Sequence, residues 1–149
     1  KVKYIAPYVT LIHAVDTLKL LKEINKQAEK AGRTIDCLLQ VHVAKEETKF
    51  GFLPDELREM LEGSEWKELK NVRIRGLMCM ATNTDDERQI HSEFHEVKEL
   101  FDELKTRHFQ SGSTFSELSM GMSDDYKIAI EEGSTMIRVG SLIFGARNY

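Results

Sequence analysis

Short apolar segments alternate along the chain with segments of helical periodicity, and this alternation limits the possible folds more than any other feature. Five apolar runs have the length and composition of strands, at residues 11–15, 37–43, 72–80, 115–120 and 135–140. Between them, apolar residues recur every three or four positions, which is typical of one face of a helix. Strands that alternate with helices in this way pair in parallel, with right-handed crossovers. The sequence therefore predicts an α/β fold of five βα units.

Residues that favour helix ends separate the apolar runs. We expect helices to begin at Asp16, at Pro54, at a capping box in residues 84–87, and at Ser123. Glycines that can end a helix follow at Gly32, Gly63 and Gly133. The longest predicted helix carries an apolar stripe of Phe94, Val97, Leu100, Phe101 and Leu104. This stripe predicts that one side of the helix is buried.

The predicted strands are apolar on both faces, as in a parallel sheet that is covered on both sides. Two architectures share this pattern: an open doubly wound sheet and part of a (β/α)8 barrel. The βα repeat is about 30 residues long, as expected for a barrel of roughly 250 residues in eight units. No linker-like change of composition divides the 149 residues, so we expect one domain, 1–149.

Composition excludes several classes of protein. The chain has 21 Lys and Arg against 25 Asp and Glu, a net charge of −4, and lacks the basic surplus of a nucleic-acid-binding domain. No apolar run approaches the roughly 20 residues that span a bilayer, and residues 1–4 do not resemble a signal peptide. Cys37 and Cys79 each lie in an apolar run without metal-ligand spacing. We therefore expect two reduced core thiols and a cytoplasmic protein.

In parallel α/β folds, binding residues lie at the carboxyl ends of the strands. Two neighbouring strand ends carry small and hydroxylated residues, at 119–124 and 140–145. Backbone N–H groups and hydroxyls in such loops bind anions well. This pattern predicts a phosphate site between these two loops. Ser123 lies in the same stretch and also fits a plain helix cap.

Arg138 lies in an otherwise apolar strand, where a guanidinium needs a partner. Two interpretations stay open: an ion pair with a barrel carboxylate, or a cation that faces a ligand near the phosphate. His13 and His42 fit hydrogen-bonded wall residues better than metal ligands, because no third ligand has a suitable spacing. The charged residues between Asp85 and Lys105 are expected to form the solvated face of a helix.

Two C-terminal segments together resemble the signature of the pyridoxal phosphate homeostasis proteins (YggS-like). Residues 119–124 read Ser-Met-Gly-Met-Ser-Asp, and residues 133–147 read Gly-Ser-Thr-Met-Ile-Arg-Val-Gly-Ser-Leu-Ile-Phe-Gly-Ala-Arg. Residues 11–16, 39–52 and 75–78 match further blocks of this family. The resemblance covers essentially all 149 residues.

The resemblance implies the fold of the alanine racemase N-terminal domain, a (β/α)8 barrel that binds pyridoxal 5′-phosphate (PLP). It implies that Ser119 and the backbone of Gly140 and Ser141 hold the phosphate, and that Arg138 faces the pyridine nitrogen. Met80 is expected to pack where the racemases have a histidine beside the ring. The implied function is non-catalytic PLP binding in intracellular PLP homeostasis.

The chain also departs from the family pattern. The first three βα units, about 90 residues, and the lysine that forms the Schiff base have no counterpart. His42 stands where asparagine is usual, and Ser141 stands where threonine is common. We therefore expect weak, non-covalent PLP binding, and exposed strand edges that favour self-association.

Two alternatives stay open. One is a fold-type III PLP enzyme such as an amino-acid racemase, which needs a lysine base and a second acid/base group that the sequence does not show. The other is a truncated structural fragment without ligand function. The partners expected for the leading interpretation are PLP and PLP-dependent apo-enzymes, with no nucleic acid and no membrane.

Overall fold

The computed structural model describes residues 1–47, 50–110 and 114–147. Within these residues, the strands are β1 (Leu11–Val15), β2 (Ile35–Val41), β3 (Val72–Cys79), β4 (Glu117–Met122) and β5 (Met136–Arg138). The helices are α1 (Val2–Ile5), α2 (Leu18–Lys30), α3 (Pro54–Glu62), α4 (Glu87–His108), α5 (Tyr126–Glu131) and α6 (Ser141–Phe144), with a 3₁₀ helix at Glu65–Glu68. All neighbouring strands pair in parallel, which confirms the predicted α/β class.

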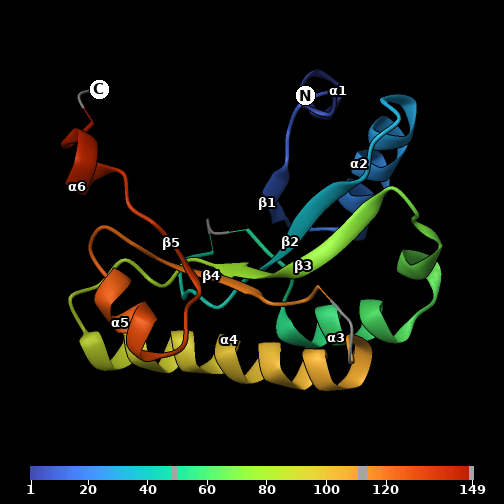
Figure 1. The fold of residues 1–149 in the computed structure, drawn as a ribbon. Helices are drawn as coiled ribbons and strands as arrows, with labels where there is room; N and C mark the ends of the chain where they lie inside the picture. Colours follow the sequence, from blue (N-terminus) through green and yellow to red (C-terminus); the bar gives the residue numbers. More distant parts are fainter. Residues whose placement is uncertain (48–49, 111–113, 148–149) are drawn as a thin grey trace.

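The order of the strands in the sheet, β1-β2-β3-β4-β5, follows the order of the chain. A doubly wound sheet reverses direction at a switch point, whereas a barrel adds each strand on the same side. This order therefore favours barrel-type winding over the doubly wound alternative. Figure 1 shows the sheet curving, with α3, α4 and α5 along its outer side.

The outer face of the sheet packs against these helices and forms the core. Alternate residues of β2 (Ile35, Cys37, Leu39 and Val41) belong to one buried apolar cluster. The five predicted stripe residues of α4 are buried in the same cluster, which confirms that prediction. Burial raises the pKa of the Cys37 thiol to about 12 and also raises the pKa of the Cys79 thiol. Both side chains are therefore free thiols at neutral pH.

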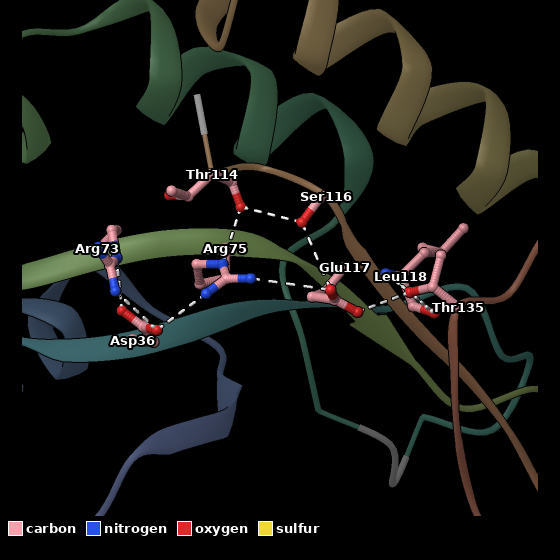
Figure 2. Close-up of polar contacts among 8 residues, drawn as sticks. All are labelled: Asp36, Arg73, Arg75, Thr114, Ser116, Glu117, Leu118 and Thr135. Atoms are coloured by element: carbon pink, nitrogen blue, oxygen red, sulfur yellow. Dashed lines mark hydrogen bonds and ion pairs between the residues drawn. The ribbon is translucent and has the colours of Figure 1, made fainter. Parts of the chain in front are cut away.

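The inner face of the sheet carries charged side chains near the N-terminal ends of the strands (Figure 2). Asp36 accepts from Arg73 Nε at 2.7 Å and from Arg75 Nη1 at 3.2 Å. Arg75 Nη2 lies 3.8 Å from Glu117 Oε1, and Thr135 Oγ1 donates to Glu117 Oε2 at 3.0 Å. We call Asp36, Arg73, Arg75 and Glu117 the inner ladder. It ties β2, β3 and β4 together, with every charge paired.

A glycine beside the inner ladder lets two strands approach closely. The pairing of β2 with β3 shifts between Cys37 and Leu38, which leaves Arg75 as the extra residue of a bulge. The next residue, Gly76, has φ +155°, and a Cβ there would overlap the carbonyl oxygen of Glu117 in β4. Glycine is therefore the residue that this crossing of β3 and β4 requires.

Three predicted helix starts are wrong by one or two residues. Thr17, rather than Asp16, caps α2 and accepts from Leu20 N at 3.0 Å. Asp86 caps α4, so residues 84–87 form no capping box. The cap position of α5 is Asp125, two residues after Ser123. Each start has several neighbouring Asp, Ser or Thr residues with similar capping ability, and the turn that leaves the strand decides which one is used.

The bounds of four strands also differ from the prediction: β3 ends one residue earlier, and β5 covers residues 136–138 rather than 135–140. β2 ends at Val41 because the chain turns out, with His42 N donating to Phe52 O at 2.8 Å. β4 covers residues 117–122 rather than 115–120. Phe115 lies before it, stacked between Phe109 and Phe101 with ring centroids 4.2 and 4.9 Å away. In the described part of the chain, no helix combines the length and apolar character that crossing a membrane needs.

Candidate functional site

An open hollow of about 790 Å³ lies beyond the C-terminal ends of β4 and β5. The loop after β4 contributes Ser123 and Asp124, and the segment from Ile137 to Ser141 forms the opposite side. Arg147 also lines the hollow. The structure therefore brings three predicted site residues together here: Arg138, Gly140 and Ser141.

The rim around Gly140 offers hydrogen-bond donors. Among the described residues, none accepts from the backbone N–H of Gly140 or Ser141. The next N–H, that of Leu142, donates to Ser123 Oγ at 3.3 Å, which joins the two loops. Space around Gly140 is open, because a Cβ there would meet no atom within 4 Å. Two N–H groups, two serine hydroxyls and a nearby arginine suit an anion such as a phosphate ester.

Arg138 reaches from β5 across β4 to β3. Its Nη2 donates to the backbone carbonyl of Cys79 at 2.8 Å. Within the described residues no carboxylate pairs with it, and its Nε is buried without a partner. Burial lowers the pKa of Arg138. Of the two interpretations left open by the sequence, the carboxylate ion pair is therefore absent from the described residues.

Two further residues are connected with Arg138, Met80 by its position in the chain and His13 by its electrostatics. Met80 directly follows Cys79, the residue whose carbonyl anchors the guanidinium. His13 of β1 has its pKa lowered by burial and by the positive charge of Arg138, so its neutral form is favoured at pH 7. His13 Nδ1 is buried and has no partner among the described residues. The expected hydrogen-bonded wall residue thus has no hydrogen bond at this atom.

Ser119 lies in β4, level with Met78 of β3 and Met136 of β5. Its side chain is fully buried, its Oγ has no described partner, and it does not line the hollow. β4 continues to Met122, three residues beyond Ser119, so the serine that reaches the hollow from this stretch is Ser123. The predicted strand ended at residue 120, whereas β4 ends at Met122, so Ser123 is the first serine after the strand.

The residues present fit PLP at both ends. The donors around Gly140 and Ser141 suit its phosphate, and the anchored guanidinium suits the acceptor nitrogen of its ring. No lysine lines the hollow among the described residues. These residues also contain no group of three His, Cys, Asp or Glu side chains that could hold a metal ion.

Comparison with known proteins shows the family of this chain. The family described as "Alanine racemase, N-terminal domain" matches residues 1–148. The chain belongs to this family. The alanine racemase N-terminal domain family is thus shown over nearly the whole length, as the resemblance predicted.

Two bacterial relatives show which members of the family this chain resembles in sequence. The chain is 41% identical to the pyridoxal phosphate homeostasis protein of Aquifex aeolicus, over 100% of this chain and 63% of that protein. It is 40% identical to the protein of the same name from Helicobacter pylori, over 90% of this chain and 56% of that protein. The chain therefore spans about three-fifths of the length of these relatives. The predicted resemblance to pyridoxal phosphate homeostasis proteins is confirmed.

Two solved structures share the fold of this chain. PipY of Synechococcus elongatus with PLP bound superposes with a TM-score of 0.86 at 32% identity, covering 97% of this chain and 65% of PipY. Alanine racemase of Clostridium difficile gives 0.70 at 16% identity, covering 91% of this chain and 36% of the racemase. The predicted barrel type is therefore confirmed. The second likeness concerns the fold alone.

Proposed function

We propose that this chain forms the Arg138 side of a PLP site in a non-catalytic PLP homeostasis protein. One observation carries the proposal: an arginine held by a backbone carbonyl, rather than by a carboxylate, stands beside two backbone N–H groups that have no acceptor within the described ranges. PipY, the relative with PLP in its structure, has the same fold. This supports PLP as the ligand.

The phosphate end is assigned to Gly140, Ser141 and Ser123. Their N–H and hydroxyl groups lie on one rim, and the bond from Leu142 N to Ser123 Oγ sets the spacing of the two loops. Ser119 was the serine expected from the sequence. Its buried hydroxyl is assigned to the wall of the barrel instead, below the level of the rim.

The ring end is assigned to Arg138 and Met80. Bound PLP supplies an aldehyde and an electron-withdrawing pyridine ring, which withdraws electrons most strongly when its nitrogen is protonated. The permanent positive charge of Arg138 disfavours a proton on that nitrogen. Met80 gives the ring an apolar contact without a group that could transfer a proton. This pair therefore suits the storage of PLP better than its use in catalysis.

The wider setting follows from the same assignment. PLP-dependent apo-enzymes are the proposed recipients, and the cytoplasm is the proposed location, in keeping with two buried thiols. β1 and β5 are the edges of the described sheet, so self-association is proposed to occur through them.

The test is a titration of the chain with PLP, followed by absorbance of the pyridine ring. Arg138→Ala should weaken binding by at least about tenfold, because it removes a charge-assisted hydrogen bond to the ring. Arg107→Ala, which removes an exposed arginine of α4 that pairs with Glu62, is the matched control. Equal affinities of the Arg138→Ala variant and the unaltered chain would contradict the proposal.

A further inference from the structure

A buried carboxylate lies on the side of α4 that faces the sheet, next to the loop that follows β3. Glu93 is only 6% exposed, although it stands among charged residues. Among the described residues, no Lys, Arg or His forms an ion pair with it. A buried carboxylate without a cation needs hydrogen-bond donors around it. Glu93 is one of the charged residues between Asp85 and Lys105 that were expected on the solvated face of the helix, and its burial contradicts that expectation.

The donors come mainly from one residue, Thr82. Its backbone N donates to Glu93 Oε1 at 2.6 Å, and its Oγ1 donates to Glu93 Oε2 at 2.7 Å. Gln89 Nε2, one helical turn earlier in α4, donates to Oε2 at 2.9 Å. Glu93 therefore accepts hydrogen bonds from both the main chain and the side chain of Thr82.

Further hydrogen bonds connect Thr82 and its neighbour to the loop after β2. Lys45 N donates to Thr82 Oγ1 at 2.8 Å. The single proton of the Thr82 hydroxyl is donated to Glu93, and a lone pair on the same oxygen accepts from Lys45 N. A second bond, from Asn83 N to Glu46 Oε1 at 2.7 Å, joins the same two loops. Glu93 thus lies at the end of a chain of bonds that fixes the loops after β2 and β3.

The segment that ends at Thr82 also holds Arg138 in place. Thr82 is three residues from Cys79, whose carbonyl accepts from Arg138 Nη2 at 2.8 Å. Met80 and the largely buried Ala81 lie between these two fixed points. We infer that Glu93 is a positioning residue: through Thr82 it fixes the segment from Cys79 to Thr82, and so sets the direction of Arg138 and the place of Met80 at the ring end of the site. This inference rests on the proposed function.

The alternative is that Glu93 stabilises the loops and nothing more. Thr82→Val separates the two, because it keeps the shape of the side chain and removes the hydroxyl. Thr84→Val is the matched control, since Thr84 Oγ1 accepts only a local bond from Asp86 N within the described part of this loop. Thr82→Ser restores the hydroxyl. Glu93→Gln changes the other partner and replaces Thr82→Val should that variant not fold.

Two ligands report on the two ends of the site. Thr82→Val should weaken PLP binding about five- to tenfold, the scale of one ordinary hydrogen bond. It should leave the binding of inorganic phosphate unchanged, since the backbone around Gly140 takes no part in the hydrogen bonds between Glu93, Thr82 and Lys45. Thr82→Ser should recover PLP affinity, and Thr84→Val should match the unaltered chain. A purely structural role would lower stability in Thr82→Val without separating PLP from phosphate.

The NMR signal of the Arg138 Nε–H group tests the same inference without PLP. This signal should shift in Thr82→Val and stay in place in Thr84→Val. Unchanged PLP affinity together with an unshifted Arg138 signal would overturn the inference. If the unaltered chain binds no PLP, the proposed function fails, and the Arg138 signal alone then decides whether Glu93 sets the position of the guanidinium.

Discussion

The two ends of the inner face use the same side chain in opposite ways. Near the N-terminal ends of the strands, Arg75 meets Asp36, Glu117 and the carbonyl of Thr114, so its donors are largely used within the protein. Near the C-terminal ends, Arg138 meets only the carbonyl of Cys79 among the described residues. A guanidinium whose hydrogen bonds are satisfied internally stabilises the sheet, whereas one that is left partly unpaired is available to a ligand. Substitutions at the two ends should therefore separate stability from binding.

The largest effect is expected near the N-terminal ends of the strands, from Gly76→Ala. The added Cβ would overlap the carbonyl of Glu117 at a φ of +155°, so β3 and β4 would have to separate. We expect a loss of about 3 kcal/mol or more in the free energy of unfolding, measured by urea denaturation. Gly32→Ala is the control: its φ is +65° with no atom within 4 Å of the new Cβ, so about 1 kcal/mol should be lost. Equal losses for the two variants would contradict the close approach.

A smaller loss of stability is expected from Asp36→Ala. This change leaves Arg73 and Arg75 without their shared carboxylate. Because the Arg73 side chain is half exposed and can turn to water, the expected loss is about 2 kcal/mol rather than the larger value of a fully buried pair. PLP affinity should not change. A variant that keeps its stability but loses PLP binding would break the comparison between the two ends.

The reverse pattern is expected for Arg138→Met. Removing the guanidinium costs one hydrogen bond to Cys79 but relieves the burial of a charge whose Nε has no partner in the described part of the chain. The free energy of unfolding should therefore stay within about 1 kcal/mol of the unaltered chain, while PLP affinity falls. Denaturation curves of the two proteins, recorded without PLP, check the first half of this statement. A large loss of stability would place Arg138 in the same class as Arg75.

The smallest effect is expected on the outer surface, where two histidines of α4 hold Glu132 after α5. His91 Nδ1 and His95 Nδ1 each lie 3.0 Å from a Glu132 oxygen. Hydrogen bonds to Glu132 and Glu99 raise the pKa of His95, so its contribution to stability is present below the unfolded pKa and is lost as pH rises through the folded pKa. Hydrogen bonds from His91 and His95 lower the pKa of Glu132, so that contribution is lost only in acid. Between about pH 6 and pH 8, the unaltered chain should lose a small part of its stability relative to His95→Gln. Parallel pH profiles of the two proteins would contradict this assignment.

The sequence predicts the architecture better than the site. Alternating strands and helices and the α4 stripe follow from periodicity, which depends on many residues at once. Strand ends depend on single hydrogen bonds, such as His42 N to Phe52 O, and these cannot be read from composition. Ser119 was expected at the phosphate from the family resemblance, whereas the hollow is lined by Ser123, because β4 continues two residues beyond its predicted end.

Glu93 shows a signal that the sequence did contain. Ile90, Glu93, Val97, Leu100 and Leu104 follow the three-and-four spacing of one helix face, and all five are buried. A carboxylate at a position of an apolar stripe indicates a buried group with partners, yet the charged residues around it suggest a solvated surface. Its partner Thr82 lies eleven residues away in a loop whose path only the structure shows.

The anchoring of Arg138 by a main-chain atom affects how this part of the molecule tolerates mutation. Cys79 turns its thiol into the core and its carbonyl toward the guanidinium. Any small apolar residue at this position would present the same oxygen, so Cys79→Ala or Cys79→Val should keep the arginine in place. The site thus depends on the course of the backbone at residue 79. Substitution of the side chain there by another small apolar residue should leave ligand affinity unchanged.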